Sequence, residues 1–130
     1  MRLERRRAVA ASELAVCLPV IVLLVLAMIE SCTMIFLKQS LTASAYEGVR
    51  NALVQNADAR DVQAACEAVL RDRRVQGANI AVLPANWERI APGQYVEVTV
   101  SAPAARNSVI PGSFFPGRTL TATAVMMKEF

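Results

Sequence analysis

Hydrophobic residues dominate the N-terminal third of the chain. From residue 14 to residue 29 every residue is apolar or Pro, and after a short polar interruption the run resumes at residues 34–37. At about 1.5 Å per residue, a helix over this stretch crosses the roughly 30 Å hydrocarbon core of a bilayer. Its many Leu, Ile and Val residues outweigh the insertion cost of about 3 kcal/mol for one central acid, Glu30. The pattern predicts a transmembrane helix over residues 9–37.

The helical pattern continues past the membrane segment. Residues 38–55 contain no Pro, and small or apolar residues recur there at spacings of three and four. We interpret this stripe as the face that packs on the protein's own domain, with a purely partner-binding face as the alternative. The stripe consists of Leu41, Ala45, Gly48, Val49 and Ala52.

A second, shorter helix is predicted over residues 59–75. Asp58 is a suitable N-cap, and Asp61 would lie favourably at the start of the helix. Gly77 fits just beyond its end. We interpret the arginines at the C-terminal end as solvated cations that suit the helix dipole, with an anion site as the alternative. These arginines are Arg71, Arg73 and Arg74.

The period then changes from helical to alternating. Valines at positions 96, 98 and 100 share one face of the clearest strand, at residues 95–101, and further strands are predicted at 79–83 and 119–127. Two helices followed by three strands indicate an α+β fold with a small antiparallel sheet packed on helices. One loop carries Trp87. Another carries Phe114 and Phe115, which we expect to be buried rather than exposed as a contact surface.

The charge distribution sets the expected orientation. The 130-residue chain has a net charge of +3, and four of its arginines lie in a leader at residues 1–8. Basic flanks stay in the cytoplasm, so the domain at residues 38–130 should be extracytoplasmic. The remaining basic residues are scattered among acids without interleaved aromatics, so we expect no nucleic-acid partner.

Motifs that carry chemistry are missing from the sequence. The chain has no histidine, and neither a CxxC pair, an HExxH motif nor a Gly-rich phosphate loop occurs. Two of the three cysteines lie in the apolar stretch, and we expect Cys66 to be a small buried residue of the second helix. The sequence therefore predicts no enzyme activity, no metal, no cofactor and no small-molecule substrate.

Two acids in the apolar segment stand out. Glu13 lies at its start and Glu30 lies near its end. Ionisable residues at membrane depth are costly and point to a function with a definite partner. Each acid has a simpler interpretation as an interfacial residue at the edge of the bilayer. The sharper hypothesis is that Glu13 or Glu30 pairs with a positive group of a neighbouring subunit.

Four segments follow one another after the Arg-rich leader: residues 9–16 (VAASELAV), Leu18-Pro19, residues 28–30 (MIE) and residues 38–50 (KQSLTASAYEGVR). They combine an acid at the start of an apolar run with Leu-Pro, a second acid, and a polar helical continuation. This pattern resembles the TadE-like family, whose members are minor pseudopilins of tight-adherence pilus systems. The chain departs from the family pattern at three places. Leu14 replaces the aromatic residue after the first acid, Ser31-Cys32 replaces Phe-Gly after the second acid, and Tyr46 replaces the Arg of Arg-Glu-Gly.

The resemblance implies a pilin-like fold and a processing step. A prepilin peptidase would remove the leader between Ala8 and Val9, where Ala8 replaces the family's Gly. The new α-amino group at Val9 would pair with Glu13 of an adjacent subunit. The implied partners are the membrane, other pilins or pseudopilins and the peptidase, at the bacterial inner membrane. We therefore predict a non-enzymatic pseudopilin, with a signal-anchored extracytoplasmic binding module as the alternative.

Overall fold

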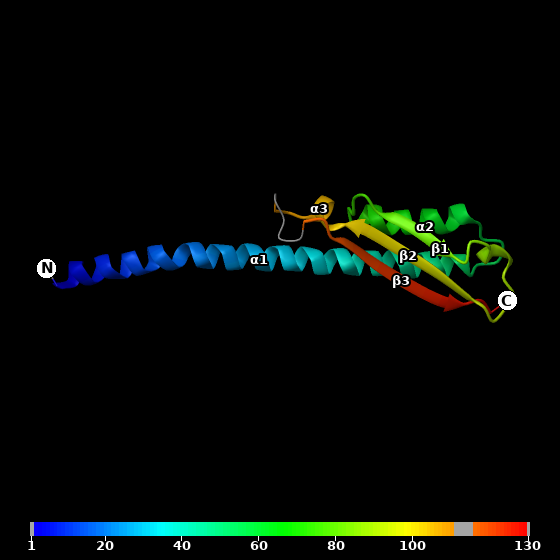
Figure 1. Cartoon of the computed structure of the whole chain (residues 1–130), viewed down its shortest axis with the longest axis horizontal. Coiled ribbons are helices and arrows are strands. Elements are labelled where there is room, and N and C mark those ends of the chain that lie inside the picture. Colours follow the sequence, from blue (N-terminus) through cyan, green and yellow to red (C-terminus); the bar gives the residue numbers. More distant parts are fainter. Residues whose placement is uncertain (1, 111–115, 130) are drawn as a thin grey trace.

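A single long helix carries a small domain at one end (Figure 1). The computed structural model describes residues 2–110 and 116–129, with side chains described from Ala8 onward. The domain packs against the C-terminal half of the helix, and the N-terminal half projects away from it as a rod (Figure 1). In chain order the elements are α1 (Arg2–Ala52), α2 (Ala59–Asp72), β1 (Asn79–Leu83), η1 (Trp87–Arg89), β2 (Tyr95–Pro103), α3 (Ala104–Asn107) and β3 (Thr119–Met127). The fold is α+β, as predicted.

Helix α1 is continuous through Pro19 and has two halves with different surroundings. In the C-terminal half, apolar residues spaced by three or four positions face the domain and are buried. The stripe therefore packs on the protein's own domain, as we interpreted it. Its predicted members Leu41, Ala45, Gly48, Val49 and Ala52 are all buried, and Leu37 extends the buried face by one turn.

Helix α2 starts at a capping box. The Asp58 carboxylate accepts hydrogen bonds from the Arg60 and Asp61 amides, and the Asp61 carboxylate accepts one from the Asp58 amide. Val62, Cys66 and Leu70 are buried on the inward face. The helix ends at Asp72 instead of residue 75.

Small residues let α1 and α2 approach closely. Ser44 Oγ donates to the Cys66 carbonyl at 3.1 Å, and Cys66 Sγ donates to the Ser44 carbonyl at 3.4 Å. A side chain at Gly48 would collide with Cys66, because a Cβ there would lie 2.3 Å from its sulfur. The crossing thus depends on Gly48 having no side chain.

The sheet has the order β1-β2-β3 with both pairs antiparallel. The predicted valines of β2, Val96, Val98 and Val100, are fully buried on the face that covers α1. Val98 lies opposite Val82 of β1 and Ala124 of β3, so the register places apolar residues of all three strands on this face.

Two connections contain short helices that periodicity did not predict. Trp87 of η1 is buried, so the loop between β1 and β2 contributes to the core. The other is α3, which follows β2 directly and lies beside α1 at the end of the domain nearest the projecting rod (Figure 1). Strand β2 extends to Pro103 rather than residue 101, and α1 ends at Ala52 rather than 55. Phe114 and Phe115 lie outside the described residues.

Candidate functional site

The projecting half of α1 is an apolar surface without a covering layer. Most of its large side chains are exposed, including Val16 at 76% and Met28 at 67%. Exposure of so long a continuous apolar surface to water is unfavourable, and a bilayer or a bundle of similar helices would cover it. By length and composition, this helix can cross a membrane once. The segment is consistent with a single-pass membrane protein.

The predicted processing and pairing residues lie on this rod. Ala8, Val9 and Glu13 belong to the helix and are exposed, and Ser12 Oγ donates back to the Val9 carbonyl at 2.8 Å. From Ala8 onward, no residue that the structure describes forms a hydrogen bond or an ion pair with the Glu13 carboxylate. The carboxylate of Glu13 is thus open to a partner along the helix surface.

Glu30, the other acid of the apolar segment, has a different environment. Glu30 is completely buried, and its Oε1 accepts a hydrogen bond of 2.6 Å from Ser108 Oγ. Ser108 in turn accepts from the Ile110 amide at 3.3 Å, so the hydroxyl links α1 to the chain that follows α3. Glu30 Oε2 has no hydrogen-bond partner within the described part of the chain. The structure does not bring Glu13 and Glu30 together, because both lie on the continuous helix α1 about 25 Å apart along its axis. Glu13 is exposed, whereas Glu30 is covered by the domain.

Sequence reasoning did not identify Ser108, because a single serine in a long loop has no periodic or motif signal. Asn107 was also missed. Its side-chain Oδ1 accepts from the Gln76 amide at 2.8 Å, and its Nδ2 donates to the Gln76 carbonyl at 2.9 Å. Paired hydrogen bonds of this kind fasten the connection after α2 to α3. Together, Ser108 and Asn107 hold three separate segments at one end of the domain.

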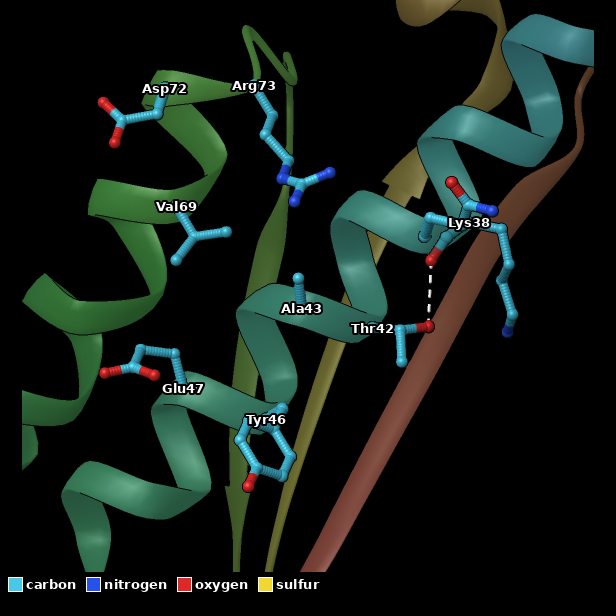
Figure 2. Close-up of a pocket in the computed structure, with 9 residues that line it drawn as sticks. Lys38, Thr42, Ala43, Tyr46, Glu47, Val69, Asp72 and Arg73 are labelled. Atoms are coloured by element: carbon cyan, nitrogen blue, oxygen red, sulfur yellow. Dashed lines mark hydrogen bonds between the residues drawn. The ribbon is translucent and has the colours of Figure 1, made fainter.

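An open groove of about 910 Å³ runs between α1 and α2 on the domain (Figure 2). Val69 and Arg73 point from α2 toward α1, while Tyr46 and Glu47 lie on the α1 side. Thr42 Oγ1 donates to the Lys38 carbonyl one turn earlier in α1 at 2.9 Å. Lys38 itself reaches across to the Thr121 carbonyl of β3. The groove walls combine charges of both signs with apolar side chains and hold no nucleophile–base pair.

Cys66 is the buried member of the three free cysteines, while Cys17 and Cys32 are exposed on α1. Burial raises the pKa of the Cys66 thiol, and the hydrogen bond to Ser44 partly opposes this effect. A raised pKa makes a poor nucleophile at neutral pH. Within residues 2–110 and 116–129, the structure contains no cluster of three or more His, Cys, Asp or Glu side chains that could hold a metal ion.

The comparison with protein families supports the resemblance. Residues 8–50 match the family described as TadE-like protein. The match confirms the resemblance predicted from the sequence over residues 8–50, which include the exposed half of α1, Glu13, Glu30 and most of the helix inside the domain. Among the curated proteins and the solved structures, nothing matches. The family match suggests a protein associated with tight-adherence pili.

Proposed function

We propose that this chain is a minor pseudopilin, a non-enzymatic assembly component of a tight-adherence pilus or a related secretion apparatus. The observation that carries the proposal is the division of α1. One half is an exposed apolar rod, and the other half is the centre of a folded domain. Such a helix can serve first as a membrane anchor and then as a packing element between subunits, with the domain left outside the bundle.

The proposed mechanism starts with removal of the leader at residues 1–8. A prepilin peptidase at the cytoplasmic face of the inner membrane would cut between Ala8 and Val9, and the domain would lie on the extracytoplasmic side. Cleavage frees an α-amino group at Val9. An amine and a carboxylate attract each other strongly in a helix bundle, where the dielectric constant is low. Glu13, which is exposed, would then pair with the amine of a neighbouring subunit.

Glu30 has a different role from Glu13 in this mechanism. Its carboxylate is covered in the monomer and bonded to Ser108, so pairing with another subunit requires that this contact open first. We therefore assign the first pairing step to Glu13. While its hydrogen bond with Ser108 is intact, Glu30 fastens the domain to the outer end of the membrane segment.

The test of processing is N-terminal sequencing of the membrane-extracted protein, expressed with its own secretion machinery. A chain that begins at Val9 supports the proposal. A chain that retains Met1 and still functions contradicts it and favours a permanently anchored binding module. Ala8→Gly should be cut at least as completely as the natural sequence, and a bulky Ala8→Leu should be cut poorly.

The test of pairing is a Glu13→Ala variant. We expect it to insert into the membrane normally, as judged by alkaline extraction, and to be lost from pili. Glu88→Ala removes an exposed acid from the far end of the domain and is the matched control. Normal incorporation of Glu13→Ala into pili would refute the pairing mechanism.

A further inference from the structure

Three arginines converge beside the point where α1 leaves its apolar segment. Arg73 and Arg74 come from the end of α2, and Arg106 comes from α3. They line one cavity of about 320 Å³ together with Thr33 and Phe36 of α1. The sequence interpretation of Arg73 and Arg74 as solvated helix-end cations does not account for this convergence with an arginine from a distant segment.

The local structure holds these side chains in place. Arg73 lies over the Phe36 ring, with its guanidinium carbon 5.9 Å from the ring centroid. Arg106 packs closely against Gly77, where a Cβ would lie 2.9 Å from the arginine Cδ. The paired hydrogen bonds between Asn107 and Gln76 fasten the two arginine-bearing segments to each other. The cavity is thus built by contacts between three elements.

The three arginines of the cavity have no acidic partner among the described residues. Within the described part of the chain, neither Arg73, Arg74 nor Arg106 forms an ion pair, whereas Arg50 lies 3.7 Å from Glu47. No acidic residue belongs to the described lining of the cavity, and Glu30, which is fully buried, is joined to that lining by its hydrogen bond from Ser108. Three guanidinium groups of this kind fit a phosphate, which accepts bidentate hydrogen bonds from arginine.

The position of the cavity identifies the source of that phosphate. The predicted transmembrane helix of residues 9–37 is longer than the hydrocarbon core requires, and Glu30 and Leu37 are buried by the domain, so the part of α1 left for a bilayer ends before Glu30. If α1 spans the membrane, residues 9–29 cover about 31 Å, and Glu30 lies at the edge of the hydrocarbon core. Phe36 lies about 9 Å further along the axis, within the headgroup layer. Phe36 is 50% exposed and Val109, at the rim of the cavity, is 68% exposed. Apolar side chains beside a cationic cavity suit a lipid better than a free anion.

We propose that Arg73, Arg74 and Arg106 form a binding site for the phosphate headgroup of an anionic phospholipid at the membrane surface that faces the domain. The bound lipid would fix the tilt and depth of the domain relative to the bilayer. The site rests on the part of the proposed function that makes α1 a membrane anchor, and it does not require a pilus.

The experiment uses the full chain in nanodiscs of equal parts phosphatidylcholine and phosphatidylglycerol. Native mass spectrometry measures which lipid stays bound after release from the disc. We expect selective retention of phosphatidylglycerol, and a loss of roughly 25-fold in its apparent affinity for the variant Arg73→Gln with Arg106→Gln, at about fivefold for each arginine. The control, Arg60→Gln with Arg89→Gln, removes the same charge at residues outside the cavity lining and should retain the lipid.

Additional variants and a competition experiment distinguish a lipid headgroup from a free phosphate and from an acidic protein segment. Arg73→Lys with Arg106→Lys keeps the positive charge but loses the bidentate hydrogen bonds of arginine, so its affinity for phosphatidylglycerol should lie between those of the natural chain and of the Gln variant. An unchanged thermal midpoint of the Gln variant excludes misfolding as the cause of its loss. In neutral detergent, inorganic phosphate should not displace the lipid at equal concentration; equal competition would overturn the lipid assignment. If the Gln variant retains phosphatidylglycerol but loses incorporation into pili, the arginines bind an acidic segment of another protein and the proposal is wrong. Failure of membrane insertion itself would refute the anchor role of α1 instead.

Discussion

Ser108 and Glu30 are 78 positions apart, and a hydrogen bond of 2.6 Å joins them at the boundary between the rod and the domain. Glu30 belongs to α1, and Ser108 belongs to the connection between β2 and β3. The bond therefore ties the last part of the domain to the segment that leads into the membrane. Glu30 is fully buried, so Ser108→Ala leaves its carboxylate buried without this bond. Ser108 is partly buried, and in Glu30→Ala its hydroxyl keeps the Ile110 carbonyl as an acceptor at 3.0 Å.

We predict that Glu30→Ala and Ser108→Ala each lower the free energy of unfolding of the domain by about 1–3 kcal/mol. Glu30→Gln retains an oxygen that accepts from Ser108 and should be less destabilising than Glu30→Ala. The measurement is thermal unfolding in a neutral detergent, followed by circular dichroism. In the double variant Glu30→Ala with Ser108→Ala the two losses should be less than additive, because both changes remove one shared bond. Full additivity would show that the contact contributes nothing.

Hydrogen exchange supplies a second readout for the same pair. In the Glu30→Ala variant, amides of residues 104–110 should exchange faster, while the amides of β2 that face β1 keep their protection. Uniformly faster exchange over the whole domain would instead indicate a global loss of stability.

The crossing of α1 and α2 yields a steric prediction. A Cβ at Gly48 would lie 2.3 Å from Cys66 Sγ and 3.1 Å from Val98 Cγ1. Gly48→Ala should therefore destabilise the domain by about 1–3 kcal/mol through overpacking, despite the higher helix propensity of alanine. The variant Gly48→Ala with Cys66→Ala removes the closest obstacle and should recover part of the loss. If the two single losses simply add, the collision with the sulfur is not the cause.

Much of this architecture was predictable because it depends on periodicity. The buried stripe of α1 and the alternating valines of β2 are local patterns, and burial of one face follows directly from them. The capping box at Asp58 and Asp61 is likewise a local signal. These features could be assigned before the path of the chain was known.

The contacts at the end of the domain nearest the rod were not predictable for the opposite reason. Ser108, Asn107 and Arg106 lie in a connection without a regular pattern, and their partners lie on α1 and after α2. Which residues meet there depends on the length and course of β2 and on where α3 turns. Trp87 shows the same limit, because a lone aromatic residue in a loop does not reveal whether the loop folds back on the core.

Cys66 yields a prediction about pH. Burial raises the pKa of its thiol above that in the unfolded chain, so the native state holds the proton at a pH where the unfolded state has released it. Protonation then favours the folded form, and this contribution is present in full below the unfolded pKa of about 8.5. The contribution is lost as the pH rises through the folded-state pKa. The domain should become less stable above the unfolded value, and Cys66→Ala should show a smaller loss over the same range.

The measurement is the thermal midpoint of both proteins between neutral pH and about pH 10, in a background of Cys17→Ser and Cys32→Ser. Tyrosines and lysines titrate equally in the two proteins, so the difference between their curves isolates the thiol. In the same background, maleimide should label Cys66 only after unfolding, because the native thiol is buried and protonated at neutral pH. Parallel pH curves, or rapid labelling of the folded protein, would show that the sulfur is accessible in solution and that α1 and α2 separate readily at Gly48.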